Sequence, residues 1–130
     1  MTVRLDLPRE AGSVPAVRRL LRSALAVLHV DHQTGDDLEI AISEACSNVI
    51  HHAGGTKSFE VHLEVADHHC AIDVRDEGSG FDPVEAGSES PGASSERGRG
   101  LFLIKALTEN VRLQSSPRRG SLIHFEKSFA

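Results

Sequence analysis

Two neighbouring segments in the middle of the chain alternate apolar and polar residues over their whole length. The apolar residues of the first segment, FEVHLEV at 59–65, share one face: Phe59, Val61, Leu63 and Val65. The second segment, CAIDVRD at 70–76, follows a turn at 67–69 and repeats the pattern. A period of two is typical of strands with one buried face, so the segments predict a β-hairpin. Its apolar face requires a second layer.

Helical patterns before and after the hairpin supply that layer. A first helix is expected from Ser13 to near His29, and a second from cap residues at 34–37 to about His52, where Gly54 and Gly55 would end it. GLFLIKAL at 100–107 predicts a third helix.

Three further segments read as strands: VRLDL at 3–7, VRLQS at 111–115 and SLIHFEKSF at 121–129. Residues 82–97 lack apolar periodicity, and a loop of this length is typical of a functional segment. The element order predicts an α+β protein, a two-layer α/β sandwich with helices covering one face of a mostly antiparallel sheet. We expect one domain over residues 1–130.

Charge and composition exclude several classes of protein. The net charge is -5, and the chain has five Phe but no Trp or Tyr, so neither a basic stripe nor stacking aromatics indicate nucleic-acid binding. The start, MTVRLDLPRE, does not resemble a signal peptide, and no apolar run approaches membrane-spanning length. We therefore expect a cytoplasmic protein without membrane contact. Cys46 and Cys70 are expected to be reduced packing residues.

Eight histidines raise the question of a metal site. The candidates are His51, His52, His62, His68 and His69. Zinc needs three or four converging ligands, whereas two of these histidines fall in the predicted turn and one lies on the polar face of its strand. We therefore expect no structural zinc site.

The second helix carries polar residues beside its buried stripe. Leu38, Ile42, Ala45 and Val49 define that stripe at helical spacing. Glu44, Asn48 and His52 follow one another at intervals of four along its flank. A carboxylate and an amide at the edge of the core could face a ligand, or they could form a solvated flank.

Two glycine-containing segments offer further candidates. Strand alternation points Asp76 inward, where it either caps the following turn or accepts a hydrogen bond from a ligand such as an adenine amino group. Gly78 and Gly80 would let a ligand approach the backbone. RGRG at 97–100 precedes the third predicted helix, where it is either an anion site or a simple helix start.

These three segments resemble the motifs of one superfamily. EACSNVIHHA at 44–53 resembles the N box, RDEGSGFD at 75–82 the G1 box, and GRGLFLI at 98–104 the G2 box of the GHKL, or histidine-kinase-like, ATPases with a Bergerat-type fold. The pattern of Glu44, Asn48 and His52 is most similar to that of the small anti-sigma-factor serine/threonine kinases of partner-switching systems.

The resemblance implies a role for each motif. Glu44 would be the general base, Asn48 would bind Mg²⁺ held by ATP, and Asp76 would accept from the adenine amino group. The other implied nucleotide-binding residues are His52, Gly78, Gly80, Arg97, Gly98, Arg99, Gly100 and Leu101, with an ATP lid at about 82–97.

The implied function is that of an ATP- and Mg²⁺-dependent protein kinase. It would phosphorylate a Ser or Thr of a small STAS-type anti-anti-sigma protein and, as a homodimer, sequester a sigma factor. The alternative is a nucleotide-dependent binding module that holds its partner without kinase activity. Glu44 favours the kinase, because a pure binding module needs no general base.

Overall fold

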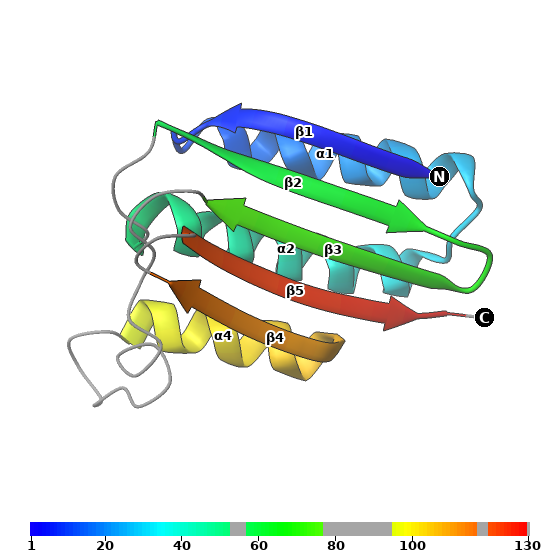
Figure 1. Ribbon diagram of the computed structural model, residues 1–130. Helices are drawn as coiled ribbons and strands as arrows, with labels where there is room; N and C mark the ends of the chain where they lie inside the picture. Colours follow the sequence, from blue (N-terminus) through cyan, green and yellow to red (C-terminus); the bar gives the residue numbers. More distant parts are fainter. Residues whose placement is uncertain (53–56, 77–94, 117–119, 130) are drawn as a thin grey trace.

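The computed structural model describes residues 1–52, 57–76, 95–116 and 120–129, which form a sheet backed by helices (Figure 1). The elements in chain order are β1 (Thr2–Pro8), α1 (Ser13–Val27), α2 (His32–His52), β2 (Ser58–Val65), β3 (His69–Asp76), α4 (Ser95–Leu107), β4 (Glu109–Ser116) and β5 (Gly120–Ser128). The five described strands pair in the order β1-β2-β3-β5-β4, with each neighbouring pair antiparallel. The predicted fold class and element order are therefore confirmed.

The register of the central strands explains how the alternating residues build the core. Leu63 lies opposite Ile72 across β2 and β3, and Ile72 in turn lies opposite Phe125 of β5. Each of these side chains is at most 4% exposed. Side chains of matching parity thus form continuous apolar rows beneath the helices, and removal of that apolar area from water stabilises the two-layer arrangement.

The helices contribute the other half of the core, and all of them lie behind the sheet in Figure 1. The predicted stripe of α2 is confirmed, because Leu38, Ile42, Ala45 and Val49 are each at most 1% exposed. Cys46 and Cys70 are free and buried, as expected, and burial raises the pKa of both thiols to about 12. They therefore act as apolar packing residues.

The ends of the first two helices differ from the prediction. Helix α2 begins at His32, because the carboxylate of Asp31 caps it by accepting from the Thr34 backbone N–H at 3.1 Å and hydroxyl at 2.7 Å. These hydrogen bonds lower the pKa of Asp31. Helix α1 ends at Val27, because His29 adopts a φ of 56° and the Val30 N–H bonds back to the Leu25 carbonyl at 3.0 Å.

The start of α4 is also different from the prediction. The helix begins at Ser95, so Gly98 and Gly100 lie within it and do not precede it. Contacts with α2 explain why a helix persists through two poor helix formers: Gly100 is buried against that helix. The segment that the sequence assigned to the end of the lid is thus the first turn of α4.

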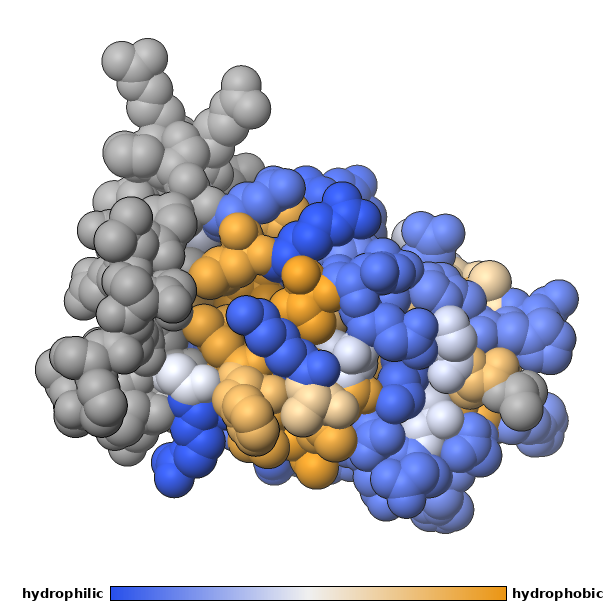
Figure 2. All heavy atoms as spheres, turned by 90° about the horizontal axis from the view of Figure 1, so that it is seen from below, coloured by the Kyte–Doolittle hydropathy of each residue, from blue (hydrophilic) through white to orange (hydrophobic). Residues whose placement is uncertain are grey.

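Helix α4 buries only part of its apolar surface. Leu101 and Ile104 face the core, whereas Phe102 is 68% exposed. Viewed from the side of α4 and β4, apolar side chains gather into one area beside a hydrophilic one (Figure 2). Among the helices in the described part of the chain, none is both long enough and apolar enough to cross a membrane.

Candidate functional site

The candidate residues come together at one end of the two-layer sandwich. Strand β3 ends there at Asp76, β5 begins there, and the last turns of α2 lie next to the first turns of α4 (Figure 1). The chain termini lie at the opposite end. Residues from the N box-like, G1 box-like and G2 box-like segments are therefore neighbours in space, although more than fifty positions separate the first from the last.

Glu44 and Asn48 of α2 face Gly100 of α4. A Cβ atom built on Gly100 would lie 2.7 Å from Glu44 Oε2 and 3.5 Å from both Asn48 amide atoms. The glycine therefore allows the two helices to approach closely while leaving the carboxylate in place. This contact joins a carboxylate, an amide and the backbone of a glycine-rich helix start in one small region.

The amide of Asn48 is buried in this contact. The residue is 5% exposed, and its Nδ2 atom has no hydrogen-bond partner among the residues that the structure describes. A buried amide donor normally has a partner, because its desolvation costs about 1–3 kcal/mol otherwise. Asn48 is thus a buried amide at the contact between α2 and α4 and not part of a solvated flank.

Asp76 occupies the inward position that strand parity predicted. It is 1% exposed and stands directly opposite Ser121 in the register of β3 and β5. Ser121 is 4% exposed, and its hydroxyl has no hydrogen-bond partner within the described residues. Two buried polar side chains thus lie side by side on the inner face, next to the apolar pair Val74 and Ile123.

Ser121 was missed by the sequence analysis. Its signal was nonetheless present, because Ser121 has the same strand parity as Ile123 and Phe125 and is therefore a polar residue in a core-facing position. The pairing with Asp76 could not be read from that parity, since it depends on the register of two strands that are far apart in sequence.

A hollow of about 360 Å³ reaches Glu44 from the solvent side of α1 and α2. Its other lining residues are Arg18, Asp36, Glu39, Ile40 and Ser43. Glu44 is half-buried, so its carboxylate is held by neighbouring elements yet remains accessible. The hollow therefore brings part of Glu44 next to solvent, together with residues of α1 and α2.

Ion pairs fix the wall of this hollow. The guanidinium of Arg22 on α1 contacts both Asp36 and Glu39 of α2, the latter at 2.5 Å. These hydrogen bonds, first that to Asp36 and then that to Glu39, raise the pKa of Arg22. Gly35 permits the arrangement, because a Cβ atom there would lie 2.6 Å from Arg22 Nη1.

The remaining predicted site residues fall into two groups. Gly98 lies in the first turn of α4, Arg99 is exposed, and Leu101 packs in the hydrophobic core. Gly78, Gly80, most of the predicted lid at 82–97 and the side chains of His52 and Arg97 lie outside the described residues.

The fold and the cluster of site residues define a class of nucleotide-binding protein. The family model of the histidine kinase-like ATPase domain matches residues 7–125. The chain therefore belongs to the histidine kinase-like ATPase family, as its motifs predicted.

Relatives within this family carry more specific names. The chain is 31% identical over 125 residues to the serine-protein kinase RsbW of Halalkalibacterium halodurans, with 87% of this chain and 75% of the relative covered. It is 30% identical over 124 residues to the serine-protein kinase RsbW of Bacillus subtilis, covering 87% and 78%. The anti-sigma F factor of Clostridium acetobutylicum is 30% identical over 101 residues, covering 73% and 71%.

A solved structure supports the fold independently. The structure of the RsbU and RsbW domains of Rv1364c from Mycobacterium tuberculosis superposes with a TM-score of 0.76 at 22% identity. The match covers 98% of this chain and 32% of the other. The similarity to serine-protein kinases and to an anti-sigma F factor is thus one of sequence, and the solved structure adds a shared fold.

Proposed function

We propose that this protein is a Mg²⁺- and ATP-dependent serine/threonine protein kinase that also acts as an anti-sigma factor. The observation that carries the proposal is the contact of Gly100 with Glu44 and Asn48, at the same end of the sheet as Asp76. A general base, an amide and an adenine reader would thereby surround one nucleotide. Serine-protein kinases and an anti-sigma factor among the relatives support the same reading.

The adenine end of the nucleotide would lie at Asp76 and Ser121. An ionised carboxylate only accepts hydrogen bonds, so Asp76 suits the exocyclic amino group of adenine and not the carbonyl of guanine. The buried hydroxyl of Ser121 can donate to a ring nitrogen or to Asp76 itself. Gly78 and Gly80 would line this pocket, as the family resemblance implies.

The phosphate end would lie between α2 and the start of α4. Asn48 would hold Mg²⁺ through its amide oxygen, a ligand type that this hard cation accepts, and the ion would neutralise charge on the transferred phosphoryl group. His52, Arg97, Gly98, Arg99, Gly100 and Leu101 are the further residues that we assign to nucleotide binding. The lid at about 82–97 would cover the phosphates.

Glu44 would act on the protein substrate. Its carboxylate accepts the proton of a Ser or Thr hydroxyl while the oxygen forms a bond to the γ-phosphorus and the bond to the bridging oxygen breaks, which releases ADP. The substrate hydroxyl would reach this carboxylate from the hollow that Glu44 lines together with Ile40 and Ser43. The products are ADP and a phosphoprotein.

The biological partners follow from the same proposal. The substrate would be a small anti-anti-sigma protein of the STAS type, and the sequestered partner a sigma factor. We propose a cytoplasmic homodimer of a single-domain chain that contacts neither nucleic acid nor membrane directly.

The test is phosphoryl transfer from radiolabelled ATP to antagonist proteins recovered by pull-down from the native cell. Glu44→Gln keeps the size of the side chain and removes the base, so transfer should fall by about 100-fold or more while ADP affinity changes little. Transfer that survives in Glu44→Gln would remove Glu44 from the role of base. ATP binding with no transfer in the wild type would favour the binding module.

A further inference from the structure

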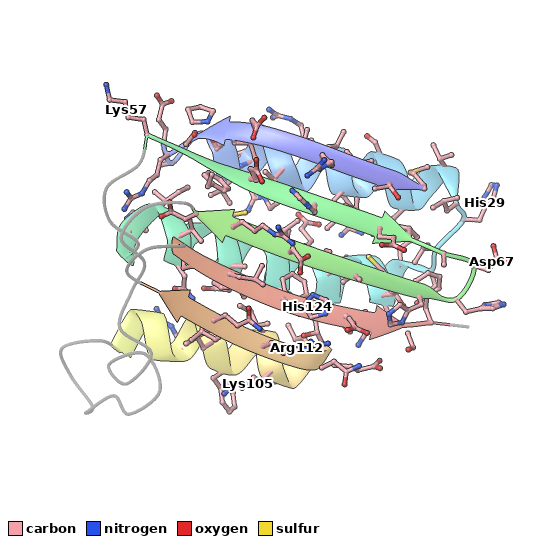
Figure 3. The ribbon with its side chains drawn as sticks, viewed as in Figure 1. His29, Lys57, Asp67, Lys105, Arg112 and His124 are labelled. Atoms are coloured by element: carbon pink, nitrogen blue, oxygen red, sulfur yellow. The ribbon has the colours of Figure 1, made fainter. Side chains whose placement is uncertain are left out.

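The outer face of the sheet, which no described helix covers, carries a connected set of charged side chains. His124 of β5 lies at its centre, with Arg112 on the neighbouring strand β4 (Figure 3). The Nδ1 atom of His124 is hydrogen-bonded to Asp73 of β3, and Nε2 lies 2.6 Å from Glu126 Oε2. The side chains of His124, Asp73 and Glu126 are 17%, 23% and 15% exposed, so these contacts are largely shielded from water.

The two contacts define the protonation state of His124. An ionised carboxylate offers only acceptors, whereas a neutral imidazole has one donor and one acceptor nitrogen. Both ring nitrogens can donate only in the imidazolium form, so two carboxylate partners favour the charged ring. Desolvation lowers the pKa of His124, but the hydrogen bonds and charges of Glu126 and Asp73 outweigh it, and the pKa is raised.

The other charges around this ring act in both directions. Arg112 stands opposite His124 on β4, and Arg75 of β3 lies 3.5 Å from Asp73, so two guanidinium groups oppose protonation. Each guanidinium lies farther from Asp73 or Glu126 than the His124 ring does. The side chains of Arg112 and Arg75 are also 64% and 47% exposed, so water and salt weaken their effect on the pKa of His124. The ring of His69 is 2.9 Å from Glu126 and shares that carboxylate.

The position of the cluster links it to the nucleotide site. Asp73 and His124 are cross-strand partners in the middle of the β3–β5 ladder, and Asp76 and Ser121 form its last pair. The two pairs are three residues apart, so one projects from the outer face and the other from the inner face. End pairs of a ladder open most easily, and the Asp73–His124 bond limits how far such opening spreads along the two strands.

We propose that His124 is a proton-dependent clamp that holds β3 and β5 together three pairs from their Asp76–Ser121 end and thereby keeps Asp76 and Ser121 in place for the adenine ring. His124 is a positioning residue, because it acts through the strands and does not touch the nucleotide. This inference rests on the proposed nucleotide site. It implies that nucleotide affinity depends on pH through a residue on the opposite face of the sheet.

The direction of the pH effect follows from the protonation state. A histidine whose pKa is raised by folding contributes stability fully below its ordinary pKa of about 6.5 and loses that contribution as the pH rises through the folded value. The clamp is therefore closed below the ordinary histidine pKa and opens as the pH rises through the raised pKa of His124. Nucleotide affinity should follow the same order.

The experiment measures the ADP dissociation constant from about pH 6 to about pH 9 for four proteins. Wild-type affinity should fall several-fold over this range, because the clamp loses its proton as the pH rises. His124→Gln, which is always neutral, should bind weakly throughout with a flat profile, whereas His124→Arg, which is always charged, should keep its affinity at alkaline pH. His32→Gln is the matched control, because His32 is exposed at the start of α2, whereas His62 stands opposite Asp73 across β2 and β3.

Hydrogen exchange of the Asp76 and Ser121 amides supplies a readout that needs no ligand. In the wild type, exchange of these two amides should accelerate with pH more steeply than the intrinsic exchange rate does. In His124→Arg, it should follow the intrinsic rate alone. Parallel pH profiles of wild type and His124→Gln, or a His124 ring that nuclear magnetic resonance shows to titrate at or below the ordinary histidine pKa, would overturn the clamp. If His124→Gln does not fold, the pH profiles of ADP affinity are compared for Asp73→Asn and His124→Arg instead, and they test the clamp in the same way. Absence of ADP binding at every pH would instead refute the proposed nucleotide site, while exchange would still test the clamp.

Discussion

Gly100 of α4 lies so close to Glu44 of α2 that no side chain fits between them. A Cβ atom at Gly100 would be 2.7 Å from Glu44 Oε2, whereas it would make ordinary contacts of 3.5 Å with the Asn48 amide. The obstructing atom is the end of a flexible side chain, so a larger residue would displace the carboxylate and leave the backbone unchanged. The position of Glu44 is therefore set by a residue more than fifty positions away in sequence.

Gly100→Ala should separate stability from activity. Alanine in a helix interior is favoured over glycine by about 1 kcal/mol, so thermal unfolding should shift little or upward. The rate of phosphoryl transfer should fall by about 100-fold, because the general base is moved from its position. Gly12→Ala is the control, since a Cβ atom there meets nothing within 4 Å. Equal loss of activity in both variants would contradict the assignment.

Asn48→Leu should affect the free and the nucleotide-bound protein in opposite directions. Leucine removes a buried amide whose Nδ2 has no partner among the described residues, so the free protein should be unchanged or up to about 1 kcal/mol more stable. The rise in melting temperature that Mg²⁺ and ATP give the wild type should be lost. Ser47→Ala on the same helix is the control. If ATP still stabilises Asn48→Leu, and does so only in the presence of Mg²⁺, Asn48 is excluded as the metal ligand.

Asp76→Asn should reduce selectivity for adenine. The amide keeps the shape of the side chain but offers a donor where the adenine amino group needs an acceptor, so ATP affinity should fall by about 10-fold or more relative to GTP. Competition binding with both nucleotides measures the ratio. Asp6→Asn on the exposed face of β1 should leave the ratio unchanged. An unaltered ratio in Asp76→Asn would refute the placement of the adenine ring.

Lys127→Met should destabilise the packing of α4. The Lys127 ammonium donates to the Leu107 carbonyl at the end of α4 at 2.7 Å and lies 3.2 Å from Asp37 of α2. Methionine keeps the aliphatic stem but leaves both acceptors without this donor, so the free energy of unfolding should fall by about 2 kcal/mol. Lys105→Met is the control, because Lys105 is exposed and points away from the sheet (Figure 3). Equal denaturation midpoints for the two variants would show that the Lys127 contacts contribute no stability.

Local periodicity accounts for what could be predicted. The alternation in β2 and β3 identified the hairpin and the inward direction of Asp76, and the spacing in α2 identified both its buried stripe and the flank that carries Glu44 and Asn48. Helix ends were less accurate, because Asp31 and Thr34 compete as caps within three residues and only one hydrogen-bond pattern is realised.

The sequence by itself determined the types of element, their order and the faces on which the motif residues lie, because those properties depend on residues a few positions apart. Only the tertiary structure decided that Gly100 meets Glu44, that Ser121 stands opposite Asp76 and that His124 bridges two carboxylates. Each of these contacts joins segments that are dozens of residues apart. Strand register and helix packing select them, and both are set by burial of the whole core and not by any local pattern.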